Sequence, residues 1–170
     1  MYSISANEIW DLFSDFVEGN PDGGALALST QPLPANARDA LERSLDAFGY
    51  GRNALAYVTL EARAAAGQPA QTADSTAPYA APLDPRAQFL LIEGIDPICL
   101  IACDDRAVAS LEAAYRTACT RDTSMRILGR PCVLFGDLPA LLATDQGKQR
   151  AWALLKTLPR LDNATAKRSK

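Results

Sequence analysis

The chain has 170 residues, of which 48% are hydrophobic and 22% are charged, and this composition excludes fibrous and globally disordered proteins. Its net charge of -3 argues against strong non-specific attraction to a polyanion. Histidine is absent, which excludes histidine-dependent catalytic triads and histidine-ligated zinc sites.

The first half of the chain shows hydrophobic patterns that alternate between helix and strand. In chain order they predict a helix, a strand, a helix and a strand at 7–18, 25–30, 36–48 and 54–60. Asn7 is a candidate N-cap for the first helix, and Gly49 ends the second. Both strands are short apolar runs, which is typical of strands buried on both faces.

The second half begins with an Ala- and Pro-rich stretch, 64–82, which predicts a mobile loop because it has little to bury. The elements that follow are predicted at 84–95 (helix), 98–103 (strand), 106–118 (helix), 126–128 (short strand), 132–135 (strand) and 145–158 (helix). The last helix is expected to bury Trp152, Leu155 and Leu158. The basic tail at 162–170 is predicted to be flexible.

Strands separated by helices of this length require parallel crossover connections. The sequence therefore predicts one α/β domain over 1–161, a three-layer α/β/α sandwich around a central four-stranded, mainly parallel sheet. The N-terminal MYSISANEIWDLF has no leader pattern, and no stretch reaches the ~20 apolar residues of a membrane span, so we expect a cytoplasmic protein with no membrane contact.

Three segments resemble the uracil-DNA glycosylase superfamily in order and spacing. They are 132–161 with Leu141-Leu142, Lys148, Ala151-Trp152 and Leu155-Lys156, 95–111 with Pro97, Ala102, Ala107 and Leu111, and 37–60 with Leu41, Leu45, Gly49, Arg52, Tyr57 and Thr59. The similarity covers roughly 25–160. It implies a uracil-DNA glycosylase-like fold.

The site loops of that family are altered in this chain. The first-loop acidic residue has no equivalent, because Thr30 and Gln31 occupy the matching stretch. The aromatic platform falls in a deletion after Leu33, and the base-reading asparagine corresponds to Leu60. The histidine that stabilises the excised base falls on Asp137, whose carboxylate would repel an anionic leaving group. The resemblance therefore implies a domain that has lost base excision.

Cofactor chemistry is not expected from the cysteines. The branch of the family with an iron-sulfur cluster places cysteines before Cys99, where this chain has none, and Ala64 stands at one matching place. Cys99, Cys103, Cys119 and Cys132 are predicted to be buried thiols. We expect no iron-sulfur cluster, no other cofactor and no resident metal.

Any ligand of an open parallel sheet binds beyond the carboxyl ends of its strands. The residues predicted at that edge are Ser29, Thr30, Thr59, Glu61, Asp104, Asp105 and Asp137. Asp104, Asp105 and Asp137 would converge on a hard cation such as magnesium, or would instead cap helices and turns. Ser29 or Thr30 would act as a nucleophile only with an Asp or Lys base beside it.

Three classes of function stay open from the sequence. The first is a glycosylase-like domain that no longer excises bases and retains weak nucleic-acid binding. The second is a protein-interaction module, and the third is an enzyme of different chemistry at the acidic edge. Arg121, Arg126, Arg130, Lys148 and Arg150 form either a basic strip for phosphates or an ordinary solvated face.

Overall fold

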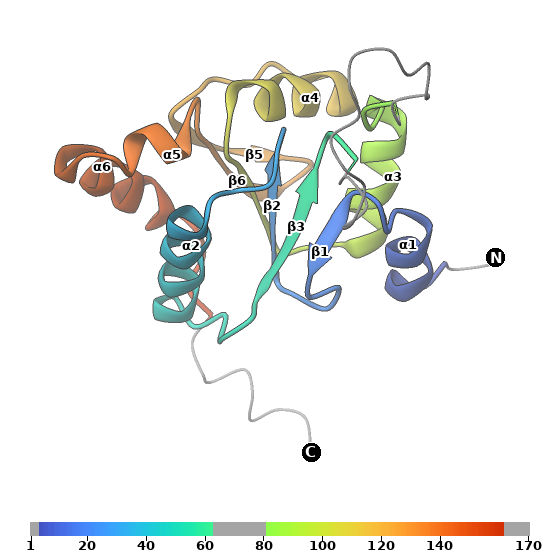
Figure 1. Ribbon diagram of the computed structural model, residues 1–170, viewed down its shortest axis with the longest axis horizontal. Coiled ribbons are helices and arrows are strands. Elements are labelled where there is room, and N and C mark those ends of the chain that lie inside the picture. Colours follow the sequence, from blue (N-terminus) through green and yellow to red (C-terminus); the bar gives the residue numbers. More distant parts are fainter. Residues whose placement is uncertain (1–3, 63–80, 162–170) are drawn as a thin grey trace, which may run out of the picture.

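The computed structural model describes residues 4–62 and 81–161 (Figure 1). The helices are α1 (Ala6–Leu12), α2 (Ala35–Ala47), α3 (Pro85–Ile95), α4 (Asp105–Tyr115), α5 (Leu138–Leu141) and α6 (Asp145–Leu155). The strands are β1 (Val17–Gly19), β2 (Ala25–Ser29), β3 (Leu55–Thr59), β4 (Cys99–Ala102), β5 (Thr123–Ile127) and β6 (Arg130–Leu134). The α/β class is confirmed. The predicted tail at 162–170, and the predicted loop except for its last two residues, lie outside the described residues.

The sheet has six strands in the order β1-β3-β2-β4-β6-β5. The four inner strands are mutually parallel, whereas β1 and β5 pair antiparallel at the two edges. The expectation of a four-stranded sheet is therefore corrected to a six-stranded mixed sheet. The four strands predicted from apolar runs are the inner ones, because burial on both faces requires apolar residues at every position.

The first helix is shorter than its sequence pattern predicts. Ser5 caps α1 in a reciprocal capping box with Glu8, and the helix ends at Leu12. Val17 belongs to β1, where it pairs with Val58. The amide of Thr59 also donates to the Phe16 carbonyl at 2.9 Å. Pairing with β3 thus overrides the helical spacing of the segment after Leu12.

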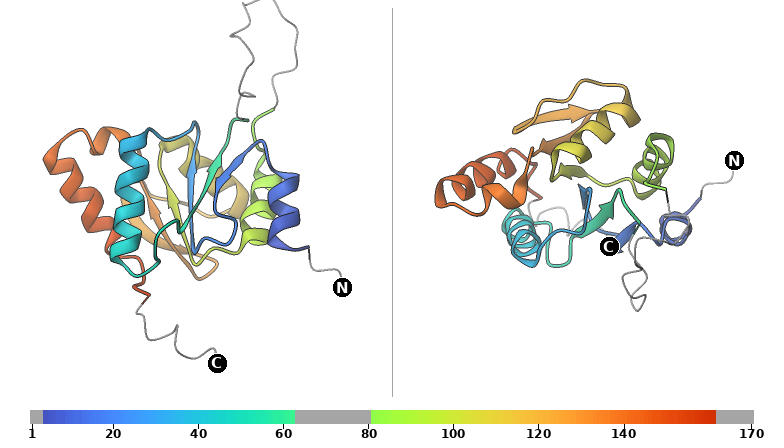
Figure 2. Two further views of the ribbon diagram at one scale, coloured as in Figure 1. Left: turned by 60° about the horizontal axis from the view of Figure 1, so that its bottom comes forward. Right: turned by 45° about the horizontal axis from the view of Figure 1, so that its top comes forward.

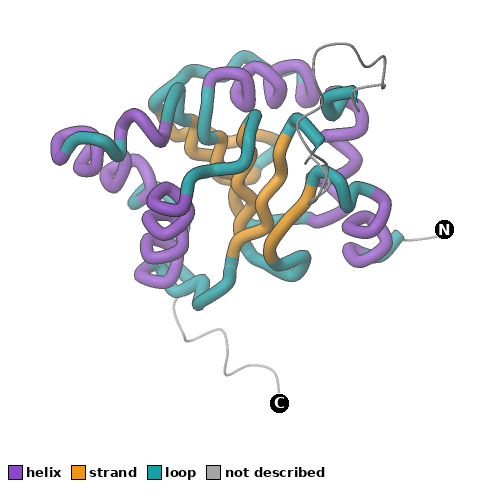
Figure 3. The backbone as a smooth tube through the Cα atoms, in the orientation of Figure 1, coloured by secondary structure: helices purple, strands orange, loops and turns teal. Residues whose placement is uncertain are grey.

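Two hydrophobic layers enclose the sheet on opposite faces. The alternation within β2 shows this directly, because Leu26 and Leu28 face the layer of α1, α3 and α4, while Ala25 and Ala27 face α2, α5 and α6. Figure 2 shows the helices on either side of the strands, and Figure 3 shows the sheet enclosed between them. The four cysteines are buried free thiols, as predicted. None of the helices in the described parts is long and apolar enough to cross a membrane.

Candidate functional site at the carboxyl ends of the parallel strands

The carboxyl ends of β2 and β4 form the point at which the chain connections diverge. The connection after β2 runs to α2 on one face of the sheet, and the connection after β4 runs to α4 on the other. Ligands of open α/β sheets bind in the crevice at such a topological switch point. Thr30 follows β2 and Asp104 follows β4, so these residues lie on the two sides of that crevice.

Thr30 and Asp104 are hydrogen-bonded to each other across the switch point. The Thr30 amide nitrogen donates to Oδ2 of Asp104 at 2.6 Å, and the Thr30 hydroxyl donates to Oδ1 at 2.6 Å. Asp104 is also the N-cap of α4, since its Oδ1 accepts from the Ala107 amide at 2.8 Å. The carboxylate thus joins the β2–α2 loop to the first turn of α4. Three donors converge on it from within the protein.

The geometry gives Thr30 a carboxylate neighbour but does not present it as a nucleophile. Thr30 is 8% exposed, and its hydroxyl hydrogen points to Asp104 rather than to solvent. Ser29 is buried as well, and its hydroxyl donates to the Gln31 carbonyl at 2.7 Å. Both hydroxyls therefore hold the loop conformation.

Asp137 caps the short helix that follows β6. Its Oδ1 accepts from the Ala140 amide at 3.0 Å, and its backbone forms an isolated bridge with Asp104. The Leu138 amide adds a bond to the Cys103 carbonyl at 2.9 Å. Asp137 therefore has a local structural role, which fits the alternative in which the three aspartates cap helices and turns.

The remaining candidates at this edge of the sheet also have partners inside the protein. Asp105 pairs with Arg121 at 2.6 Å. Gln31 donates to Glu61, and Glu61 pairs with Arg106 at 3.1 Å. Leu60 is buried in the layer of α1, α3 and α4. Within residues 4–62 and 81–161 no three His, Cys, Asp or Glu side chains form a group suited to a metal ion.

Two open hollows adjoin at Gly136 and Asp137. The first, called here the proline hollow, has a volume of about 370 Å³, and its walls include Pro32, Leu33, Pro34, Arg106 and Pro139. The second, called here the Arg150 hollow, has a volume of about 460 Å³, and its walls include Asp122, Leu141, Thr144, Gln146 and Arg150. The sequence indicated strand-end residues and a basic strip that includes Arg150, but not Arg106 or the proline wall.

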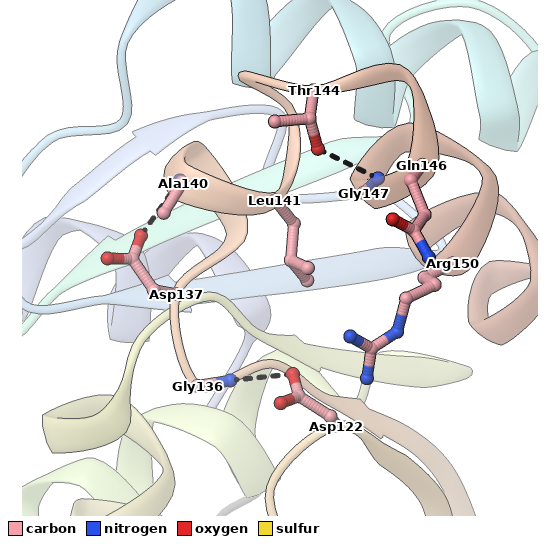
Figure 4. Close-up of a pocket in the computed structure, with 9 residues that line it drawn as sticks. All are labelled: Asp122, Gly136, Asp137, Ala140, Leu141, Thr144, Gln146, Gly147 and Arg150. Atoms are coloured by element: carbon pink, nitrogen blue, oxygen red, sulfur yellow. Dashed lines mark hydrogen bonds between the residues drawn. The ribbon is translucent and has the colours of Figure 1, made fainter.

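The Arg150 hollow has an arginine at its mouth, and two backbone amides on its walls are hydrogen-bonded within the protein. Figure 4 shows the Arg150 guanidinium extending from α6 over the hollow toward Asp122. Asp122 accepts from the Gly136 amide at 3.2 Å, and Thr144 caps α6 by accepting from the Gly147 amide at 3.0 Å. No hydrogen bond or ion pair joins Arg150 to another described residue. Arg150 is thus available to a ligand.

The predicted basic strip is not continuous in the structure. Arg121 is paired with Asp105, and Arg126 donates to the Gly129 carbonyl at 2.6 Å. Arg130 lies at the start of β6, where it pairs with Glu93 at 2.8 Å and Asp96 at 2.9 Å. These internal bonds of Arg121, Arg126 and Arg130 fit the alternative of an ordinary solvated face better than that of a continuous basic strip.

No protein-family model matches the chain, and no curated protein matches it.

Proposed function

We propose that this chain is a divergent uracil-DNA glycosylase-like domain that has lost base excision and binds nucleic acid weakly at the carboxyl ends of its parallel strands. The proposal starts from the resemblance of 37–60, 95–111 and 132–161 to that superfamily. Four inner parallel strands between two helical layers are compatible with the fold that the resemblance implies. The six-stranded mixed sheet adds an antiparallel strand at each edge.

The loss of base excision is supported above all by the internal bonds of the residues at the matching loop positions. Thr30 is tied to Asp104, Asp137 caps α5, and Leu60 is buried in the core. Base excision requires groups aimed at the sugar and at the departing base. Here the polar groups at those positions are engaged in holding loops and helix ends, and Leu60 has no polar group to offer.

The two hollows supply the surfaces that we assign to binding. Pro32, Leu33 and Pro139 give the proline hollow an apolar wall against which an unpaired base would pack. Arg106 and Arg150 lie at the margins, where they would meet phosphates. Acidic side chains surround both arginines, so few phosphates are neutralised. We expect weak binding with a shallow dependence on salt.

The alternative of an enzyme at the acidic edge has less support, because Asp104, Asp105 and Asp137 each have a separate partner. The proposed function is tested by fluorescence anisotropy with labelled single- and double-stranded oligonucleotides at low salt. We expect binding by the wild-type chain and weaker binding by the double variant Arg106→Ala/Arg150→Ala. Arg52→Ala/Arg86→Ala removes the same charge elsewhere and is the matched control. No binding to either oligonucleotide would refute the proposal and favour a protein partner.

A further inference from the structure

Trp152 is more exposed than its place in the apolar pattern of the last helix predicts. It was expected to be buried, yet 38% of it is exposed on α6. Its indole stacks on Phe48, with ring centroids 5.1 Å apart and an interplanar angle of 28°. Phe48 itself is buried at the end of α2. A rigid, partly exposed aromatic surface therefore lies on the outer layer of the molecule.

Three cations accompany this indole at intervals of four residues. Lys148 lies one helical turn before Trp152, and Lys156 lies one turn after it. Lys148, Trp152 and Lys156 therefore share one face of α6. The Nζ of Lys156 lies 5.4 Å from the indole centroid, and the Cζ of Arg160 lies 5.8 Å from the Phe48 centroid. The segment after α6 is held in place, because the Leu161 amide donates to the Phe48 carbonyl at 2.8 Å.

Within the described part of the chain, these three cations lack strong acidic partners, as Arg150 does. Among the residues that the structure describes, no carboxylate pairs with Lys156 or Arg160. Lys148 reaches only the exposed Asp145, at 3.6 Å. Such a surface pair contributes little and exchanges readily with a competing anion. Three cations without a firm acidic partner in the described structure thus lie along α6 and the segment after it, in a chain of net charge -3.

We infer that Lys148, Trp152, Lys156 and Arg160 form a binding track for single-stranded nucleic acid along α6. Single-strand sites combine aromatic side chains, on which bases stack, with cations that follow the phosphates. A base would take the place of Lys156 over the indole, and the released ammonium group would bind the adjacent phosphate. Bases within a duplex are already stacked, so the track would select an unpaired strand.

The inference rests on the proposed nucleic-acid role and adds a second surface to it. α6 also contributes Gln146, Gly147 and Arg150 to the Arg150 hollow (Figure 4). These residues lie on another side of α6 from the track, because Arg150 is two residues, or about 200° around the helix, from both Lys148 and Trp152. The hollow and the track are therefore separate surfaces.

The test uses the full chain and an oligothymidylate of about 12 nucleotides, within the usual site size of single-strand binders. In a Trp10→Phe background Trp152 is the only indole, and we expect its fluorescence to be quenched on titration because a base stacks on it. Trp152→Ala should weaken binding about tenfold. Lys156→Ala, at an exposed position, should reduce the slope of log K against log salt by about 0.7. Leu12→Ala and Arg86→Ala are controls on the opposite layer and should change nothing.

Each of the following outcomes would overturn the inference. Unchanged indole fluorescence at saturation would do so, as would wild-type binding by both Trp152→Ala and Lys156→Ala. Equal quenching by polyglutamate would show that the surface responds to charge alone. If only Arg106→Ala/Arg150→Ala weakens binding, the track is wrong while the proposed function stands. If the chain binds no oligonucleotide, both fail.

Discussion

Thr30 and Asp104, 74 residues apart in the sequence, are joined by two hydrogen bonds across the switch point of the sheet. In an open α/β fold this crevice is where a ligand would lie. Here the Asp104 carboxylate accepts from the amide and hydroxyl of Thr30 and from the first turn of α4. Both residues also line the proline hollow, so this hollow opens at the switch point itself, beside the tie.

Asp104→Ala is expected to lower the free energy of unfolding by about 2–4 kcal/mol, because it removes an N-cap and leaves the buried donors of Thr30 unpaired. Thr30→Val removes only the hydroxyl bond and should cost about 1–2 kcal/mol. Both are measured by urea denaturation. Asp105→Ala is the neighbouring control and should cost less than about 1 kcal/mol, since its ion pair is exposed. Equal losses for the two aspartates would contradict the role given to Asp104.

Glu93 is expected to make the free energy of unfolding depend on pH in the acid range. Burial raises the pKa of Glu93, but hydrogen bonds from Arg130 and Tyr115 lower it by more, so the folded-state pKa is below the ordinary value. Such a group stabilises the fold at pH values above its unfolded pKa of about 4.3. This stabilisation is lost as the pH falls through the folded-state pKa. Arg130 is held firmly, with its side chain 11% exposed. Glu93→Gln should cost about 1 kcal/mol at pH 7 and flatten the acid limb of stability against pH. An unchanged acid limb would show that the pair is not the cause.

The buried thiols are expected to lower the stability of the fold at alkaline pH. Burial raises the pKa of Cys99 to about 11 and that of Cys132 to about 12. A raised thiol pKa contributes stability below the unfolded value of about 8.5 that is lost as pH rises toward the folded value. We expect slow reaction of the native protein with a disulfide reagent at pH 8, and rapid reaction of all four thiols in denaturant. Rapid native labelling would contradict the burial.

Gly147 should respond to alanine in the opposite sense from an ordinary helical glycine. An alanine there would place its Cβ against the Leu141 carbonyl oxygen, so α5 and α6 would have to separate. Gly147→Ala is therefore expected to destabilise by about 1–3 kcal/mol, although the same change normally stabilises a helix by about 1 kcal/mol. Ala153→Gly, at an exposed position of α6, measures the ordinary propensity effect. A rise in melting temperature for Gly147→Ala would refute this packing.

The inner strands could be predicted from the sequence because each is a continuous apolar run that packs on both faces. The edge strand β1 could not, since Val17 falls at helical spacing after Phe13 and its pairing with Val58 is set by tertiary contact. α5 has only four residues, too few for a periodic pattern. Thr123–Met125 were missed in β5 because they alternate in burial beside an exposed edge.

The sequence indicated where the candidate site lies, but not how its side chains bond to one another. Asp104 was recognised as an N-cap candidate from its place before a helix, and it has that role. Its bonds to Thr30 depend on β2 and β4 being neighbours, which no local pattern reveals. Trp152 was expected in the core because its spacing fits the apolar stripe, whereas it lies at the margin of that stripe over Phe48.

The most direct test of the central claim is release of free uracil from labelled single- and double-stranded oligonucleotides that contain it, recorded in the same tubes as binding at low salt. The account predicts binding without release above a heat-inactivated control, for the wild-type chain and for Asp137→His alike, because the other base-recognition groups are also replaced. Release of uracil by the wild-type chain would contradict it.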